Sequence, residues 1–162
     1  MMQTKTLHIV RHGKALQDYQ HLQDFDRPLI ERGIVANEEV ARQLRVQYDI
    51  PDLIISSHAA RSLHTAHIFA RVMGYPHNRV QANESFYLEG EKVMINIIKS
   101  LPDEVESVMI VGHNPDVTFL ANTYSVRKII YMATSSVVTI CFETDRWSQI
   151  GTAKTKCSII EK

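Results

Sequence analysis

Two short apolar runs in this chain end in the same way, at a histidine next to a glycine. Residues 7–10 stop at an Arg-His-Gly sequence, residues 11–13, and residues 107–111 stop at a Gly-His-Asn-Pro sequence, residues 112–115. Short runs of β-branched and other apolar residues predict strands that are buried on both faces, as in parallel sheets. Because ligands of such sheets bind beyond the carboxyl ends of the strands, we expect both histidines at that edge.

Apolar runs alternate along the chain with stretches in which apolar residues recur at helical spacing. Helices are predicted over about 31–48, 59–73, 91–101 and 115–122, and strands over 53–55, 79–81 and 136–142, with 147–150 as a hairpin partner. This alternation predicts an α/β fold, a three-layer α/β/α sandwich whose central sheet is mostly parallel and carries helices on both faces. The 162 residues contain no linker or internal repeat, which predicts a single domain over 1–162.

Ser57 follows a predicted strand and is expected to cap the helix over 59–73. Arg61 then falls in the first turn of that helix, where free backbone N–H groups and the helix dipole favour an anion. The alternative is that Arg61 is a solvated surface charge. Gly13 is expected to allow a turn with positive φ and a close approach of a ligand to the main chain.

His12 and Arg11 together have the chemistry of a phosphate site. A neutral imidazole is a nucleophile at neutral pH, and a guanidinium is a planar donor that suits phosphate oxygens. If His113 and Arg61 reach the same sheet edge, two imidazoles and two guanidiniums can hold a dianion there through hydrogen bonds. The sequence therefore predicts a phosphoryl pocket, with a purely structural role for the histidine at the strand end as the alternative.

Composition argues against several other functions. Lysine plus arginine and aspartate plus glutamate both number 18, so no strong field predicts a nucleic acid or an anionic membrane as a partner. No apolar run reaches the length of a membrane span, and the N-terminus lacks the apolar core of a signal peptide. A cytoplasmic location is therefore expected.

Neither the cysteines nor the histidines have the spacing of a metal site. Cys141 and Cys157 form no zinc motif and are expected to be reduced thiols. His64 and His67 share a predicted helix without a carboxylate or thiolate partner and are expected at the surface. We therefore expect no metal and no cofactor.

Four motifs resemble, in order, those of the histidine phosphatase superfamily, which is also called phosphoglycerate mutase-like. The motifs are Arg11-His12-Gly13, Arg27-Pro28-Leu29, Ser56-Ser57 followed by Arg61 and Thr65-Ala66, and Gly112-His113-Asn114-Pro115. The small size and the Gly-His-Asn-Pro form resemble the SixA-type phosphohistidine phosphatases within it. The resemblance covers residues 5–150, nearly the whole chain, and implies a phosphoglycerate mutase-like fold.

The resemblance also implies roles for four residues. His12 is the nucleophile that becomes phosphorylated, and Arg11 and Arg61 are ligands of the phosphate. His113 is the second histidine, which binds and polarises the phosphoryl group. These four residues form the expected catalytic set.

Other positions are assigned less directly by the same resemblance. Arg27 is expected to be a further substrate contact, as is Gly13 because of the close approach to the main chain that a glycine allows. Glu84 occupies roughly the position of the acid in larger mutases, which makes it a candidate proton donor. The chain departs from the family pattern at His58, where proline is frequent, and at Ile30, where a threonine commonly caps the next helix.

The activity implied is a metal-independent phosphatase reaction in two steps, through a phosphohistidine on the enzyme. The substrate implied is phosphohistidine on another protein, in signal transduction, because a P–N bond needs only modest help to break. One alternative is a phosphomonoesterase or mutase that acts on a small phosphorylated metabolite with the same scaffold. Another is a non-catalytic phosphate-binding adaptor. The oligomeric state stays open.

Overall fold

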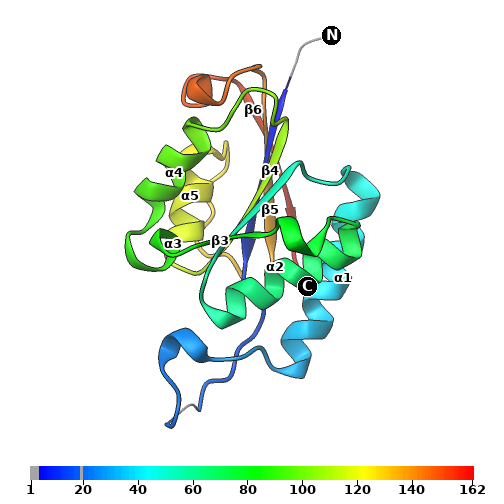
Figure 1. Cartoon of the computed structure of the whole chain (residues 1–162). Coiled ribbons are helices and arrows are strands. Elements are labelled where there is room, and N and C mark those ends of the chain that lie inside the picture. The colour runs from blue at the N-terminus through cyan, green and yellow to red at the C-terminus, as the bar shows by residue number, and fades with distance from the viewer. Residues whose placement is uncertain (1–3, 19) are drawn as a thin grey trace.

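The computed structural model describes residues 4–18 and 20–162 and contains one mixed sheet between two layers of helices (Figure 1). The six strands lie in the order β3-β2-β4-β1-β5-β6. Their bounds are β1 Lys5–Arg11, β2 Leu53–Ser57, β3 Gln81–Asn83, β4 Ser107–Gly112, β5 Val137–Phe142 and β6 Thr155–Ile160. Strands β1 to β4 are parallel to one another, whereas β5 and β6 pair in antiparallel fashion at one side.

Helices cover both faces of this sheet. One layer consists of α1 (Glu31–Gln47) and α2 (Ala60–Met73), and the other of α3 (Ser85–Leu88), α4 (Glu91–Lys99) and α5 (Asp116–Tyr124) (Figure 1). Short 3-10 helices lie between these elements: η1 Asp24–Asp26, η2 His77–Arg79 and η3 Trp147–Gln149. The predicted three-layer architecture with a mostly parallel sheet is confirmed. In the described part of the chain, every helix is too short or too polar to cross a bilayer.

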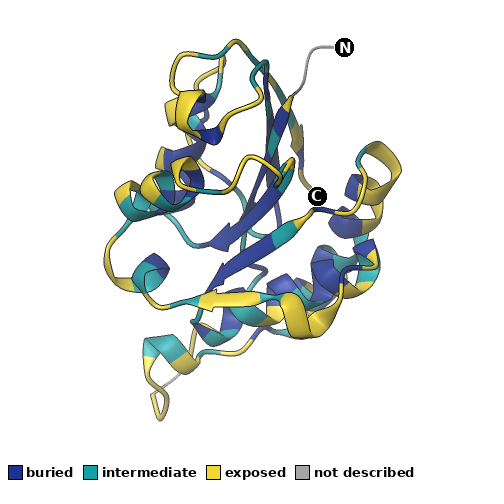
Figure 2. Ribbon diagram, turned by 45° about the horizontal axis from the view of Figure 1, so that its top comes forward, coloured by how far each residue is buried: buried dark blue, intermediate teal, exposed yellow. Residues whose placement is uncertain are grey.

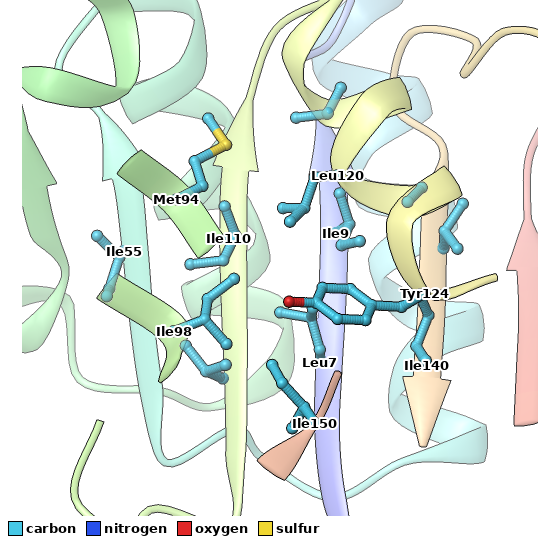
Figure 3. Close-up of a cluster of buried hydrophobic side chains, with 14 of the residues drawn as sticks. Leu7, Ile9, Ile55, Met94, Ile98, Ile110, Leu120, Tyr124, Ile140 and Ile150 are labelled. Carbon is cyan, nitrogen blue, oxygen red and sulfur yellow. The ribbon is translucent and has the colours of Figure 1, made fainter. Parts of the chain in front are cut away.

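Alternating side chains of β1 contribute to two separate cores. Leu7 and Ile9 are fully buried in the cluster on the side of α4 and α5 (Figure 3). Val10 belongs to the cluster on the side of α1 and α2. Burying one such side chain stabilises the fold by roughly 1.5–3 kcal/mol. The two packed faces therefore hold β1 in the middle of the sheet, where Figure 2 shows the strands as buried.

The expected hairpin partner of β5 is wrong. Residues 147–149 form η3, and the antiparallel neighbour of β5 is β6. Trp147 is fully buried and its indole N–H donates a hydrogen bond of 2.7 Å to the carbonyl of Val105. β6 is a partly exposed edge strand of mixed polar and apolar residues, and such a strand has little hydrophobic periodicity in the sequence.

Ser57 does not cap α2, contrary to expectation. It is the last residue of β2 and pairs with Asn83 of β3, while α2 begins after Ala59 without a side-chain cap. The pairing with β3 extends β2 beyond its apolar run. The hydroxyl of Ser57 accepts a hydrogen bond of 3.4 Å from the N–H of Ala59, and Arg61 lies in the first turn of α2 as predicted.

Gly13 serves close packing and not an unusual backbone angle. Among the described residues, the glycines with positive φ are Gly74 and Gly90, so the positive φ expected at Gly13 is not found. A Cβ atom at Gly13 would lie 2.6 Å from Nδ2 of Asn37 and 2.9 Å from the carbonyl oxygen of Gly33. Both neighbours belong to α1. The group that approaches the main chain at Gly13 is therefore this helix.

Replacing Gly33 with alanine is expected to destabilise the protein, because the new Cβ atom would collide with the backbone of Lys14. Overpacking against backbone atoms costs about 2 kcal/mol, and chemical denaturation of the variant and the wild type measures it. Gly151→Ala is the matched control, since the nearest atom to its Cβ is the flexible end of Lys99, 3.7 Å away. Equal stability of the two variants would contradict the close approach.

Candidate active site

The residues predicted to bind phosphate meet at the carboxyl ends of β1 and β4, around a cavity of about 270 Å³. The cavity is lined by Arg11, His12, Lys14, Ala15, Gln17, Arg27, Arg61, His113, Asn114 and Thr134. The register places Arg11 opposite Gly112. His12 and His113, which directly follow the two strands, therefore leave the sheet side by side.

Two predicted site residues lie outside this lining. The N–H of Gly13 donates to the hydroxyl of Thr65 over 3.0 Å, which makes Gly13 part of the support beneath His12. Glu84 is exposed and directly precedes α3. No role was predicted from the sequence for the other lining residues, which are Lys14, Ala15, Gln17, Asn114 and Thr134.

His12 is held in one tautomer. Its Nδ1 lies 2.7 Å from the carbonyl oxygen of Gly13, and a carbonyl can only accept, so Nδ1 carries the proton. The lone pair therefore lies on Nε2, which accepts a hydrogen bond of 3.3 Å from Nε of Arg61. The atom that can attack an electrophile is thus the one directed at the guanidinium.

His12 is neutral at physiological pH. Its pKa is lowered to about 3, mainly by burial and also by the charges of Arg61 and Arg11, while the bond to the Gly13 carbonyl opposes the shift. A protonated imidazole has no lone pair at Nε2 and cannot act as a nucleophile. Cations around a buried imidazole therefore keep it in its reactive form.

Arg61 is the most buried cation of the site, with 4% of its surface exposed. Besides the bond from Nε to His12, one terminal nitrogen donates to the backbone carbonyl of Asp24 over 2.7 Å. The other donates to the carboxylate of Asp24 over 3.1 Å. Asp24 also accepts a 2.9 Å hydrogen bond from Nε of Arg27. One carboxylate thus partly balances two guanidiniums.

Arg11 is aimed by the loop between α5 and β5. Its terminal nitrogen donates to the carbonyl of Met132 over 2.8 Å and to the hydroxyl of Tyr131, whose ring lies 4.8 Å from the guanidinium carbon. Nε of Arg11 is buried and has no hydrogen-bond partner among the described residues. Buried donors are rarely left unpaired. A free donor beside the cavity is what an anionic ligand would engage.

His113 follows β4 and precedes a cis peptide bond between Asn114 and Pro115. Its Nε2 lies 3.7 Å from a carboxylate oxygen of Asp116. Burial, and then the charge of Arg61, lower the pKa of His113, while the charge of Asp24 opposes them. Its buried Nδ1 has no partner among the described residues. His113 therefore offers the cavity a second imidazole with unused hydrogen-bonding capacity.

Thr65 links the elements that hold these side chains. Its hydroxyl donates to the carbonyl of Arg61 over 2.7 Å and accepts from the N–H of Gly13 and from Nδ2 of Asn37, over 3.0 and 3.1 Å. The hydroxyl joins the loop after β1 to α1 and α2. It thereby fixes the position of His12 relative to Arg61.

A larger cavity of about 410 Å³ lies at the opposite end of β1 and β4, where His8 and Tyr48 line it. None of the predicted phosphate ligands lines it. The described residues also contain no group of three or more histidine, cysteine or acidic side chains placed to share a metal ion. The chemistry therefore points to the smaller cavity.

Comparison with known proteins agrees with this geometry. Residues 7–89, just over half of the chain, match the model of the histidine phosphatase superfamily, branch 1. The chain belongs to this superfamily. A chloroplastic protein of Arabidopsis thaliana, described as uncharacterized, is 33% identical over 120 residues, which cover 68% of this chain and 55% of that protein. The chain thus matches about half the length of this curated relative.

Solved structures of the family have the same fold. The SixA structure from Agrobacterium tumefaciens is 25% identical, with a TM-score of 0.81 and coverage of 98% of both chains. The protein histidine phosphatase SixA complexed with tungstate has a TM-score of 0.82 at 19% identity, over 96% of each chain. A phosphoglycerate mutase from Bacillus anthracis has a TM-score of 0.65 at 15% identity, over 97% of this chain and 93% of its own. The predicted SixA-type resemblance is confirmed.

Acid is expected to destabilise the protein through its buried histidines. Burial lowers the pKa of His8 from 6.5 to about 4, and that of His12 to about 3. Both stay neutral in the native state while the unfolded chain takes up protons, so their contribution is fully present above about pH 6.5 and decreases below it. By about pH 5, each of these two histidines lowers the free energy of unfolding by about 2 kcal/mol. Urea denaturation across this range measures the loss.

His8→Gln tests the origin of this loss, because glutamine does not titrate and can bond to the hydroxyl of Thr139, the partner of His8 over 2.9 Å. The variant is expected to lose the slope that one proton contributes to the unfolding free energy, about 1.4 kcal/mol per pH unit near pH 5. His21→Gln, at an exposed position, is the matched control. A full slope in His8→Gln would contradict the assignment.

Proposed function

We propose that this protein is a metal-independent phosphatase that forms a phosphohistidine at His12 and takes its phosphate from phosphohistidine on another protein. The observation that carries the proposal is the unprotonated Nε2 of His12, directed at Arg61 in a cavity that Arg11 and His113 also line. Membership of the histidine phosphatase superfamily supports a phosphatase activity. The substrate class is inferred from the chemistry of the site.

In the first step, Nε2 of His12 attacks the phosphorus in line with the leaving group. The equatorial oxygens carry the charge of the transition state, and Arg11 and Arg61 donate hydrogen bonds to them. His113 binds the same group from the β4 side. Arg27 lines the same cavity and is a further contact. In the second step, water attacks the phosphorus and releases phosphate from His12.

The rim of the cavity supports a macromolecular substrate. Tyr131, which contacts Arg11, is 62% exposed, and its neighbour Ile130 is 87% exposed. Exposed apolar side chains beside a site are typical of surfaces that bind another protein. With such a substrate, the role that we propose is in cytoplasmic signal transduction. A phosphomonoesterase or mutase for a small phosphorylated metabolite is the second candidate, supported by the fold shared with phosphoglycerate mutase.

Incubation with radiolabelled phosphohistidine protein is expected to label His12, because the first step leaves the phosphoryl group on Nε2. The label is acid-labile and base-stable, and it is absent from His12→Ala.

Arg61→Ala is expected to lower kcat/KM at least about 100-fold, since one buried donor to the transition state is lost. Rapid-quench labelling and steady-state release of phosphate measure the two effects.

Arg71→Ala is the matched control, because Arg71 also lies on α2 but is exposed and pairs with Glu38. Turnover in His12→Ala equal to that of the wild type would overturn the mechanism. Failure to label any residue would favour a phosphate-binding adaptor. Faster turnover of a panel of phosphometabolites than of phosphohistidine protein would favour the second candidate.

Glu84→Gln separates the two leaving-group chemistries. A P–N bond breaks without a strong acid, so turnover of phosphohistidine protein is expected to change by less than about twofold. A loss of more than about tenfold with para-nitrophenyl phosphate and phosphate esters of alcohols would support Glu84 as their proton donor. Glu89→Gln, an exposed carboxylate at the end of α3, is the control.

A further inference from the structure

Asp24 is a carboxylate beside the phosphoryl pocket for which the two-step mechanism has no use. It begins η1, in the loop between β1 and α1, which lies next to the first turn of α2 (Figure 1). Its oxygens accept hydrogen bonds from Arg61 over 3.1 Å, from Arg27 over 2.9 Å and from the hydroxyl of Tyr87 over 2.8 Å. Two elements distant in sequence, α2 and α3, and the neighbouring residue Arg27 thus hold one side chain in place.

This carboxylate is ionised and accessible. Partial burial would raise the pKa of Asp24, but the hydrogen bonds from Tyr87, Arg61 and Arg27 and the charge of Arg61 outweigh it and lower the pKa. The side chain is 43% exposed, against 5% for that of Arg61. An ionised carboxylate has about four acceptor positions, and the contacts above occupy three. The side chain therefore retains the capacity and the exposure to accept a further N–H.

A cluster of aromatic rings lies next to Asp24, and one of them, Tyr87, is its hydrogen-bond partner. Phe25 lies 4.3 Å from the ring of His58 and 5.6 Å from the ring of Tyr87, and Tyr87 lies 5.5 Å from the ring of His113. The first three rings are only half-buried. The cluster of Phe25, His58 and Tyr87 leads from the rim to the second catalytic imidazole. It presents flat, partly apolar surfaces next to a fixed anion.

We propose that Asp24 and the aromatic cluster of Phe25, His58 and Tyr87 form a subsite for an imidazole leaving group. The carboxylate accepts the N–H of the ring nitrogen that does not carry phosphorus, and the aromatic side chains pack against the ring. The proposal rests on the proposed function, because it assigns the leaving-group side of the same pocket. It identifies the ligand chemistry as a heteroaromatic ring with one N–H.

This contact removes the need for a proton donor. A phosphohistidine ring that bears phosphorus on one nitrogen and hydrogen on the other carries a positive charge, which an adjacent carboxylate favours. Nε2 of His12 forms its bond to phosphorus as the P–N bond of the substrate breaks, and the electron pair of that bond stays on the leaving nitrogen. The substrate imidazole departs neutral with its N–H intact, and the ring of His12 takes over the positive charge.

In the second step, water hydrolyses the phosphohistidine at His12, again without a proton donor from the protein. The oxygen of water bonds to phosphorus, the bond from phosphorus to Nε2 breaks, and its electron pair returns to His12. Both protons of the water leave with the product, dihydrogen phosphate. His12 is again neutral with its proton on Nδ1, the tautomer that the Gly13 carbonyl selects.

Two other roles for Asp24 predict different kinetics. If the carboxylate only positions Arg61, its loss weakens phosphoryl transfer from every donor alike. If it only competes with phosphate for Arg61 and Arg27, its loss strengthens binding of every donor. A leaving-group subsite affects only donors whose leaving group is an imidazole.

The test compares Asp24→Asn with the wild type on two small donors, N-phosphoimidazole and para-nitrophenyl phosphate. The amide keeps the shape of the side chain and loses its charge. The ratio of kcat/KM for phosphoimidazole to that for the aryl phosphate is expected to fall about tenfold, the effect of one lost charge-assisted hydrogen bond. The ratio does not depend on the fraction of folded protein. Asp26→Asn, a charge change at an exposed position of η1, is the matched control.

An equal loss with both donors, or a gain with both, would overturn the subsite. Free imidazole gives a second readout, as it is expected to inhibit transfer from the aryl phosphate competitively in the wild type and about tenfold more weakly in Asp24→Asn. Equal inhibition of the two proteins would also count against the subsite. Phosphohistidine protein is tested in parallel. Failure of the wild type to use it, with the phosphoimidazole effect intact, would defeat the proposed function and leave the subsite standing.

Discussion

The parallel pairing of β1 with β4 is the constraint on which the site depends. It brings together two histidines that are far apart in the sequence, because Arg11 lies opposite Gly112 and the residue after each strand enters the same cavity. The register is in turn fixed by packing. A slip of one residue would exchange the faces of Leu7 and Val10, which belong to different cores, and would lose the burial of both.

The electrostatics of the site follow from this placement. Arg61 is nearly fully buried beside an imidazole, which is tolerable because Asp24 supplies a compensating charge and because His12 remains neutral. The same cations that would bind a phosphoryl dianion therefore keep the nucleophile unprotonated. Nε of Arg11 and Nδ1 of His113, which have no hydrogen-bond partner within residues 4–18 and 20–162, add unused hydrogen-bonding capacity around the same cavity. A dianion is the ligand that this arrangement complements.

Much of the fold was predictable because buried parallel strands and amphipathic helices have strong periodicity. The convergence of Arg11, His12, Arg61 and His113 was predictable as well, since the carboxyl ends of parallel strands share an edge. Their roles in catalysis stay predictions. β6 was missed because an edge strand packs through few of its side chains.

The misassigned cap and the overlooked carboxylate have another cause. Ser57 was assigned from its local sequence, but pairing with Asn83 of β3 decides its conformation. Asp24 lies in an irregular polar segment that has no period, and its importance comes from contacts with Arg61 and Tyr87, which are distant in sequence. Local patterns carry no information on such contacts.

The contact between Gly33 and the loop after β1 has a consequence for how the molecule can change. The backbone of Lys14 packs directly against the backbone of Gly33, in the first turn of α1. Because no side chain separates the two backbones, a shift of the first turn of α1 would displace the loop that carries His12. The sequence of the outer face of α1 is therefore free to vary. Its first turn, in contrast, sets the distance between His12 and the guanidinium of Arg61.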